Sequence, residues 1–183
     1  EYFSEEPYRL PAPGYAYEPP REETPEVSEL PALRNGYVTF GSLTRTIRIN
    51  DPLLRVWSEI LEHVPNSRLR LDQKSFAHEG MRELFWQRLE GLGLPRERVE
   101  LTCSTPHWNA YHDIDMTLDC WPHNAGTTTL ESLWMGVPVL TIAGKSMVSR
   151  QAASVLYGTN HGEWVSENPK EMAKKIKELL SDP

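Results

Sequence analysis

A run of small and hydroxylated residues, Asn-Ala-Gly-Thr-Thr-Thr at 124–129, follows an apolar stretch that ends at Asp119 and precedes an amphipathic stretch. This pattern predicts a turn from a strand into a helix. The first amides of a helix have no partner inside it, so they can donate to an anion that the helix dipole also stabilises. A threonine that only caps the helix would leave the same pattern. The residues of the predicted phosphate site are Gly126, Thr127, Thr128 and Thr129.

Four further residues could contact a nucleotide whose phosphate lay at this turn. Glu131 follows about one helical turn later, where its carboxylate could accept the hydroxyls of a ribose. Arg45 and Arg48 lie in the loop after the first predicted strand and could neutralise a diphosphate. His107 could hydrogen-bond a pyrophosphate or a base. Each has an ordinary alternative, namely a solvated glutamate, surface arginines and a partly exposed structural histidine.

A metal site is not expected from this sequence. Asp113-Ile-Asp115 matches the D-x-D pattern by which some sugar transferases hold a divalent cation, but the two acids flank an apolar stretch and no further cluster completes a site. The sequence also lacks a P-loop, a nucleophile elbow and a zinc spacing, which removes support for NTPase and hydrolase functions. We therefore expect no cofactor.

The segments that must position these residues alternate between short apolar runs and longer amphipathic ones. The predicted strands are residues 37–41, 68–71, 99–103, 114–118 and 137–142. The predicted helices are residues 51–64, 76–92, 127–135, 146–156 and 169–180. This alternation is typical of an α/β protein, so we predict a Rossmann-like parallel sheet with helices on both faces.

The amino-terminal residues differ in composition from the rest. Seven of the 15 prolines lie within the first 31 residues, interleaved with Tyr8, Tyr15 and Tyr17. We predict an extended linker over residues 1–34, whose aromatic side chains favour contact with another surface, and one domain over residues 35–183. A chain of 183 residues with 39% hydrophobic content suits a single core.

Charge and cysteine content limit the partners and the compartment. The net charge of −7 without a basic block argues against general binding to nucleic acid or to anionic membranes. No apolar stretch approaches the roughly 18 residues of a membrane helix. Cys103 and Cys120 fit neither a zinc motif nor a disulfide framework, so we expect a cytoplasmic protein in which both are core residues. The tryptophans expected to pack inside helices are Trp57, Trp86 and Trp134.

Four segments, in this order, resemble the catalytic region of the O-GlcNAc transferase and SPINDLY family. They are Val-Thr-Phe-Gly-Ser at 38–42, Val-Pro-Asn-Ser-Arg at 64–68, Asp-Met-Thr-Leu-Asp at 115–119 and Asn-Ala-Gly-Thr-Thr-Thr-Leu-Glu-Ser-Leu-Trp-Met-Gly-Val-Pro at 124–138. The resemblance runs from about residue 10 to residue 150. It implies the GT-B fold, of which this chain would be the carboxy-terminal, donor-binding half.

The resemblance also implies roles for individual residues. Thr127 and Thr128 match the family's diphosphate-binding threonines, Glu131 its ribose-binding acid and His107 a histidine near the nucleotide. Arg48 stands where the family usually has a lysine that stabilises the leaving diphosphate, which makes it the expected catalytic residue. Other departures are Gly126 for a histidine and Ser104 for a lysine of the animal enzymes, and His123 for a frequent tyrosine.

The implied activity is inverting, metal-independent transfer of a sugar, with UDP-GlcNAc as the expected donor, to serine or threonine hydroxyls of an acceptor protein. The implied partners within the same polypeptide are the amino-terminal catalytic half and a tetratricopeptide array, so this chain alone is expected to be inactive. A glucosyltransferase or epimerase of the same fold, and a non-catalytic interaction domain, are the alternatives. The sequence does not decide the sugar or the base.

Overall fold

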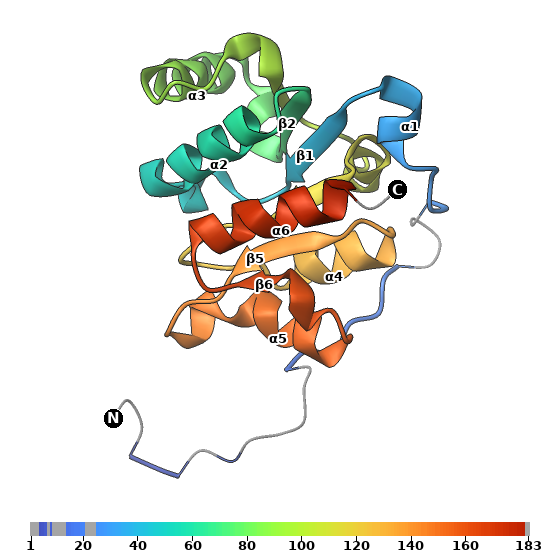
Figure 1. Cartoon of the computed structure of the whole chain (residues 1–183), viewed down its shortest axis with the longest axis vertical. Coiled ribbons are helices and arrows are strands. Elements are labelled where there is room, and N and C mark those ends of the chain that lie inside the picture. Colours follow the sequence, from blue (N-terminus) through green and yellow to red (C-terminus); the bar gives the residue numbers. More distant parts are fainter. Residues whose placement is uncertain (1–3, 7, 9–13, 21–24, 182–183) are drawn as a thin grey trace.

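A six-stranded, all-parallel sheet forms the centre of the molecule (Figure 1). The computed structural model describes residues 4–6, 8, 14–20 and 25–181. The strands are β1 Val38–Ser42, β2 Ser67–Asp72, β3 Val99–Thr102, β4 Met116–Leu118, β5 Val139–Ile142 and β6 Val165–Ser166, in the spatial order β3-β2-β1-β4-β5-β6. This is the strand order of a doubly wound Rossmann fold, so the predicted fold class is confirmed.

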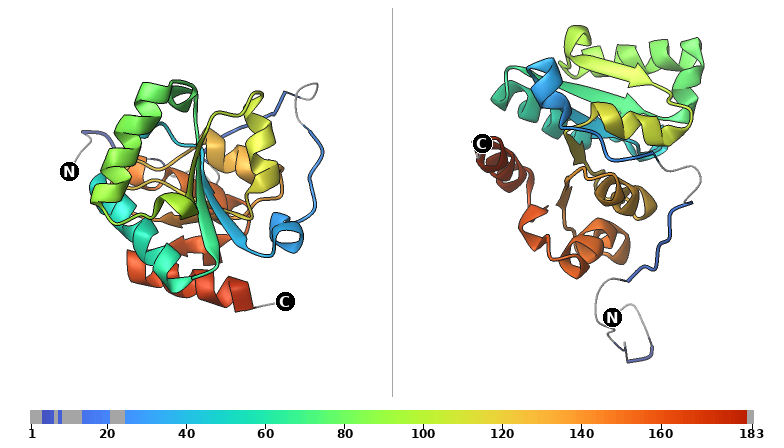
Figure 2. Two further views of the ribbon diagram at one scale, coloured as in Figure 1. Left: turned by 90° about the horizontal axis from the view of Figure 1, so that it is seen from above. Right: turned by 90° about the vertical axis from the view of Figure 1, so that its right-hand side faces the viewer.

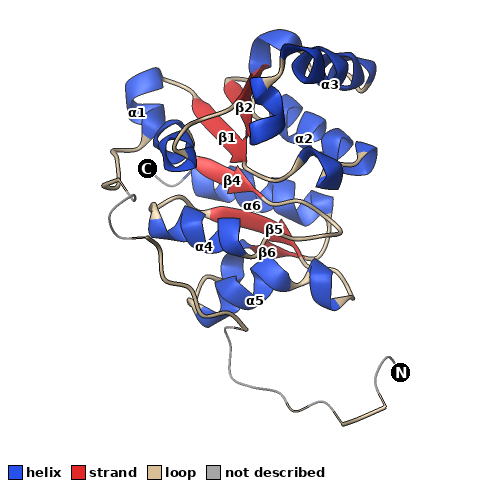
Figure 3. Ribbon diagram, turned by 180° about the vertical axis from the view of Figure 1, so that it is seen from behind, coloured by secondary structure: helices blue, strands red, loops and turns tan. Residues whose placement is uncertain are grey.

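Helices cover both faces of the sheet (Figures 1 and 3). They are α1 Pro31–Asn35, α2 Asp51–His63, α3 Glu79–Gly91, α4 Thr127–Trp134, α5 Gln151–Gly158 and α6 Pro169–Ser181. The largest apolar core lies where α2, α3 and α6 pack on one face. Two smaller clusters hold α4, α5 and a 3-10 helix, η4 (His107–Asp113), on the other face.

Local chemistry explains why the helices begin and pack where they do. The side chain of Asn50 caps α2 by accepting from the amide of Leu53, and Pro52 suits the first turn, where no amide is needed. The apolar positions of α2 then repeat at helical spacing and are buried against the sheet. They are Leu53, Leu54, Trp57, Ile60 and Leu61.

Several predicted elements differ in detail from the observed ones. Strand β6, Val165–Ser166, is too short to leave a periodic pattern and was not predicted. The helix predicted over 146–156 is divided into a 3-10 turn at Met147–Ser149 and α5. The helix predicted over 76–92 begins only at Glu79, after a 3-10 turn at Lys74–Ala77.

The prediction that the tryptophans and cysteines are core residues is only partly confirmed. Trp57 and Trp86 pack in the main core, and Cys120 is buried. The expectation for Trp134 is wrong, because this side chain lies on the outer face of α4 and is 55% exposed. Cys103 follows the end of β3 and is only partly buried.

Within the amino-terminal region, residues 14–20 and 25–34 lie along the domain (Figure 2). The amide of Ala32 donates to Asp115 at 2.7 Å, and Arg34 pairs with Asp113 at 3.2 Å. Helix α1 begins at Pro31, inside the segment predicted as a linker. The division into a linker of residues 1–34 and a domain of residues 35–183 stays a prediction.

Close packing behind β1 gives a stability prediction. A methyl group on Gly41 would overlap the side chain of Ile114, whereas one on Gly80 in α3 would meet nothing within 4 Å. We expect Gly41→Ala to lower the free energy of unfolding by about 1–3 kcal/mol through overpacking. Gly80→Ala should raise it by about 0.5–1 kcal/mol, because alanine favours the helix. Urea unfolding of both variants checks this, and equal effects would contradict the packing described for β1.

Candidate functional site

The strand order reverses between β1 and β4, and a cavity of about 330 Å³ opens beyond the carboxyl ends of these two strands. Open α/β sheets place their ligands at such a switch point. The loop after β1 and the first turn of α4 supply most of the wall. The lining residues are Tyr15, Leu43, Thr44, Arg45, Arg48, Gly126, Thr127, Thr128 and Gln151.

The amino end of α4 presents open hydrogen-bond donors to this cavity. Gly126 occupies the cap position, and no described side chain caps the helix. The carbonyl of Gly126 accepts from the amide of Thr129 at 3.1 Å, while the amides of Thr127 and Thr128 have no acceptor among the described residues. No described threonine side chain caps α4, so the interpretation of this turn as a simple helix cap is wrong. Two amides and the helix dipole point at the cavity.

Two guanidinium groups face the same space. Arg45 and Arg48 both line the cavity, and neither forms an ion pair with any residue that the structure describes. Positive charge is thus concentrated here on a chain whose net charge is −7. An anion bound between the loop after β1 and α4 would gain both charge neutralisation and hydrogen bonds.

Thr129 is a correction to the predicted phosphate site. Its side chain is 1% exposed, and its hydroxyl donates to the carbonyl of Ala125 at 3.2 Å. Successive residues of a helix point in different directions around its axis, so three consecutive threonine side chains cannot all face one anion. Thr127 and Thr128 are the two that line the cavity.

A second cavity, of about 620 Å³, adjoins the first and shares Leu43, Arg45 and Thr128 with it. His107 lies on its wall, at the start of η4. The two cavities together form an elongated site with cations and open amides at one end. The remaining lining residues of the second cavity are Asp72, Gln73, Lys74, Ser104, Thr105 and Pro106.

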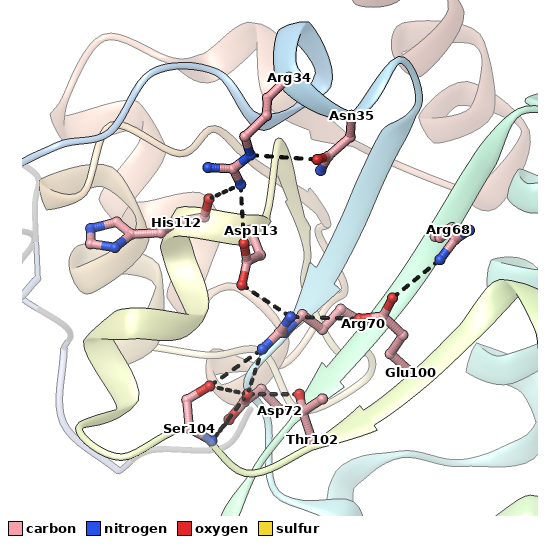
Figure 4. Close-up of polar contacts among 10 residues, drawn as sticks. All are labelled: Arg34, Asn35, Arg68, Arg70, Asp72, Glu100, Thr102, Ser104, His112 and Asp113. Atoms are coloured by element: carbon pink, nitrogen blue, oxygen red, sulfur yellow. Dashed lines mark hydrogen bonds and ion pairs between the residues drawn. The ribbon is translucent and has the colours of Figure 1, made fainter.

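A polar network fixes the loop that leads from β3 to His107 (Figure 4). Asp72, at the end of β2, accepts from the hydroxyl of Thr102 at 2.7 Å and from the hydroxyl of Ser104 at 2.6 Å. Arg70 in turn pairs with Asp72 at 3.7 Å and with Asp113 at 3.1 Å. Both ends of the segment between β3 and β4 are therefore tied to β2.

Glu131 lies next to the second cavity, against His107 on its wall, and is not itself among the lining residues of either cavity. It is only 8% exposed, and its Oε1 is 3.3 Å from Nε2 of His107. The partly buried ring of Tyr17 packs against the apolar cluster that contains Trp108 and Tyr111. Burial, together with the charge of Glu131, raises the pKa of Tyr17 to about 12.

Asp119 organises the turn before α4. It is fully buried and accepts from the amides of Cys120 and Ala125, each at 2.8 Å, and from the hydroxyl of Thr141 at 2.6 Å. These bonds draw the two ends of the 120–125 turn together against β5. The position of Gly126 therefore depends on Asp119.

The burial of Asp119 gives a prediction on pH. Desolvation raises its pKa from 3.8 to about 6, although its three hydrogen bonds oppose the shift. A folded pKa above the unfolded one means that the folded state holds the proton more tightly, so this contribution to stability is lost as pH rises from about 4 to 6. Relative to Asp119→Asn, the wild type should lose on the order of 2–3 kcal/mol of unfolding free energy over this range. Urea unfolding at several pH values checks this, and a pH-independent difference between the two proteins would contradict it.

The two aspartates of the D-x-D match have partners within the protein. Asp115 accepts from the amides of Ala32 and Thr39, and Asp113 pairs with Arg34 and Arg70. Both carboxylates hold the segment before β1 against the sheet. Among the described residues, no group of three or more histidine, cysteine, aspartate or glutamate side chains is placed to hold a metal ion.

Sequence reasoning missed several residues of the site. Tyr15 and Gln151 line the first cavity from segments far from the glycine-threonine turn. Gln73 and Lys74 line the second, immediately after β2. Gln73 and Lys74 could have been predicted from the end of β2, because side chains that follow parallel strands meet at one edge of the sheet. Tyr15 was expected to contact some surface but not this cavity, and no comparable signal marked Gln151.

Comparison with known proteins decides the family. Residues 26–182 match the model of glycosyl transferase family 41. The chain belongs to that family. The resemblance inferred from the sequence motifs is thereby confirmed.

Three relatives illustrate the similarity of this family 41 chain. It is 40% identical over 182 residues to the probable UDP-N-acetylglucosamine–peptide N-acetylglucosaminyltransferase SPINDLY of Arabidopsis thaliana, covering 97% of this chain and 20% of the relative. It is 29% identical over 148 residues to the UDP-N-acetylglucosamine–peptide N-acetylglucosaminyltransferase of Caenorhabditis elegans, covering 79% of this chain and 13% of the relative. The solved structure of a mutant Thermobaculum terrenum O-GlcNAc transferase superposes with a TM-score of 0.80 at 34% identity, covering 90% of this chain and 31% of the solved chain.

These coverages show that the family 41 chain spans about a fifth of the length of the curated SPINDLY relatives. It superposes on 31% of the chain of the solved O-GlcNAc transferase. In the part of the chain that the structure describes, no helix has the length and apolarity needed to span a membrane.

Proposed function

We propose that this chain is the donor-binding domain of an inverting, metal-independent glycosyltransferase. One observation carries the proposal. One cavity at the switch point of the sheet is lined by Arg45 and Arg48, which have no ion-pair partners among the described residues. The open helix amides of Thr127 and Thr128 line the same cavity. This combination suits the diphosphate of a nucleotide sugar.

The chemistry of transfer follows from the same groups. Negative charge grows on the diphosphate as its bond to the sugar breaks, and donors fixed before the reaction stabilise that charge most. Arg48 and the first amides of α4 are such donors, so we assign Arg48 the catalytic role of leaving-group stabilisation. The ribose would lie near Glu131 and the base in the cavity beside His107. We assign no general base to this chain.

Relatives suggest the donor and the acceptor. The curated relatives are named for the use of UDP-N-acetylglucosamine and a peptide. We propose UDP-GlcNAc as the donor and serine or threonine hydroxyls of a protein as the acceptor, in the cytoplasm. The partners within the polypeptide would be an amino-terminal catalytic half and a tetratricopeptide array. Without them this domain should bind a nucleotide but transfer no sugar.

One feature favours a second candidate function, a non-catalytic protein-binding domain. Arg48 replaces the lysine that the family usually has, and a planar guanidinium is wider than an ammonium. A protein that keeps this fold but does not bind a nucleotide would be such a domain. An epimerase or glucosyltransferase would bind the nucleotide equally well and differ only in its products.

Calorimetric titration of the protein in its full length with UDP and with GDP tests the proposal. We expect one nucleoside diphosphate to bind. Thr128→Ala keeps the open amide but removes the hydroxyl on the cavity wall, and it should weaken that binding about three- to tenfold, as loss of one hydrogen bond to a charged group would. The preferred nucleotide identifies the base. If neither nucleotide binds at millimolar concentration, the donor-site function is wrong and the interaction domain is favoured.

A further inference from the structure

Gly14 and Tyr15, which precede the Rossmann-like domain in the sequence, contact the elements that form the first cavity. The amide of Gly14 donates to the hydroxyl of Ser154 in α5 at 3.2 Å. The next side chain, Tyr15, lines the cavity itself. The backbone is therefore tied to the domain one residue before the side chain that forms part of the cavity wall.

The hydroxyl end of the Tyr15 ring lies at the amino end of α4. A carbon added to Gly126 as a side chain would be 3.6 Å from Cε1 and Cζ of this ring and 3.7 Å from its hydroxyl oxygen. No described residue hydrogen-bonds this hydroxyl. The amides of Thr127 and Thr128 also lack acceptors among the described residues. Three open donors thus lie around one end of the helix.

We propose that Tyr15 is a substrate-contact residue whose phenol hydroxyl donates a hydrogen bond to the terminal phosphate of the bound nucleoside diphosphate. This inference rests on the proposed function. It adds to the donor site a group from outside the sheet and its connecting loops. A bond from a hydroxyl to a charged phosphate oxygen is stronger than a bond between neutral groups, so this contact would contribute to affinity.

The arrangement of the two cavities indicates which phosphate Tyr15 would contact. Leu43, Arg45 and Thr128 line both cavities, whereas Tyr15 and Arg48 line only the first. With the base in the second cavity, the phosphate joined to the ribose would lie at the shared wall. The terminal phosphate would then extend into the first cavity, beside Tyr15.

The test is a calorimetric titration of the full-length protein with UDP and GDP and with the monophosphates UMP and GMP. Tyr15→Phe keeps the ring on the cavity wall and removes only the hydroxyl, so it should weaken binding of the preferred diphosphate about five- to tenfold. Binding of the matching monophosphate should change less than about twofold, because that nucleotide has no terminal phosphate for the hydroxyl to reach. Tyr8→Phe, at a tyrosine that is 90% exposed, is the matched control and should behave like the wild type.

The outcomes separate this inference from the proposed function. A wild type that binds neither diphosphate overturns the donor function and the role of Tyr15 with it. If the wild type binds a diphosphate and Tyr15→Phe binds it equally well, the ring serves only as a wall and the inference alone is wrong. An equal loss for diphosphate and monophosphate would also contradict it, because the hydroxyl would then act on the site as a whole.

Discussion

Replacing Arg48 with alanine should lower the rate of sugar transfer by the full-length protein about 100- to 1000-fold, the usual cost of one fixed donor to a developing negative charge. Arg48 lines the cavity at the amino end of α4 and has no ion pair with a described residue, so its charge is available to the diphosphate. The loss should fall mainly on kcat, because the negative charge is greatest after the bond to the sugar has begun to break. Steady-state kinetics with the nucleotide sugar measures this.

Two further variants sharpen the Arg48 experiment. Arg48→Lys restores a cation of the type that the family usually has there, and it should retain activity within about tenfold of the wild type. Arg55→Ala removes an exposed arginine from α2 and should leave the kinetics unchanged. An Arg48→Ala protein with near wild-type kcat would show that the leaving group is stabilised elsewhere.

Placing a negative charge at Gly126 should have the second large effect. A side chain at this position is tolerated, because φ is −112° and the nearest atoms, in the ring of Tyr15, are 3.6 Å from the added carbon. Aspartate at the cap of α4 favours the helix, so Gly126→Asp should fold. It should nevertheless bind the nucleoside diphosphate about 10- to 100-fold more weakly than Gly126→Asn, because the carboxylate repels the phosphates.

Asparagine is the matched control for that experiment. It has nearly the same shape as aspartate and can occupy the same helix-cap position, so the difference between the two variants reports charge alone. Calorimetric dissociation constants, with thermal unfolding of both proteins, provide the comparison. Equal binding by the two variants would mean that no phosphate lies at the amino end of α4.

The sequence predicted the parts of the site that are local in the chain. The glycine-threonine turn stands between a strand and a helix, and this local pattern is enough to predict open amides in the first turn of α4. The loop that carries Arg45 and Arg48 follows β1 directly, so its place at the carboxyl edge follows from a parallel sheet. The helix period, however, turns Thr129 inward, which a simple run of hydroxylated residues does not reveal.

Residues brought to the site by tertiary contacts could not be predicted. Tyr15 lines the first cavity from the amino-terminal region, and a proline-rich pattern does not specify such a contact. Strand β6 depends on pairing with β5, since two residues have no period of their own. The exposure of Trp134 has the same origin, because helical spacing alone does not say which face of α4 meets a neighbour.

A structure of the full-length protein with bound UDP or GDP would test the central claim most directly. We predict that the diphosphate lies at the switch point between β1 and β4, with phosphate oxygens in hydrogen-bond contact with the amides of Thr127 and Thr128 and with the guanidinium of Arg48. A diphosphate bound elsewhere, for example in the cavity lined by Lys145 and Arg150, would contradict the account.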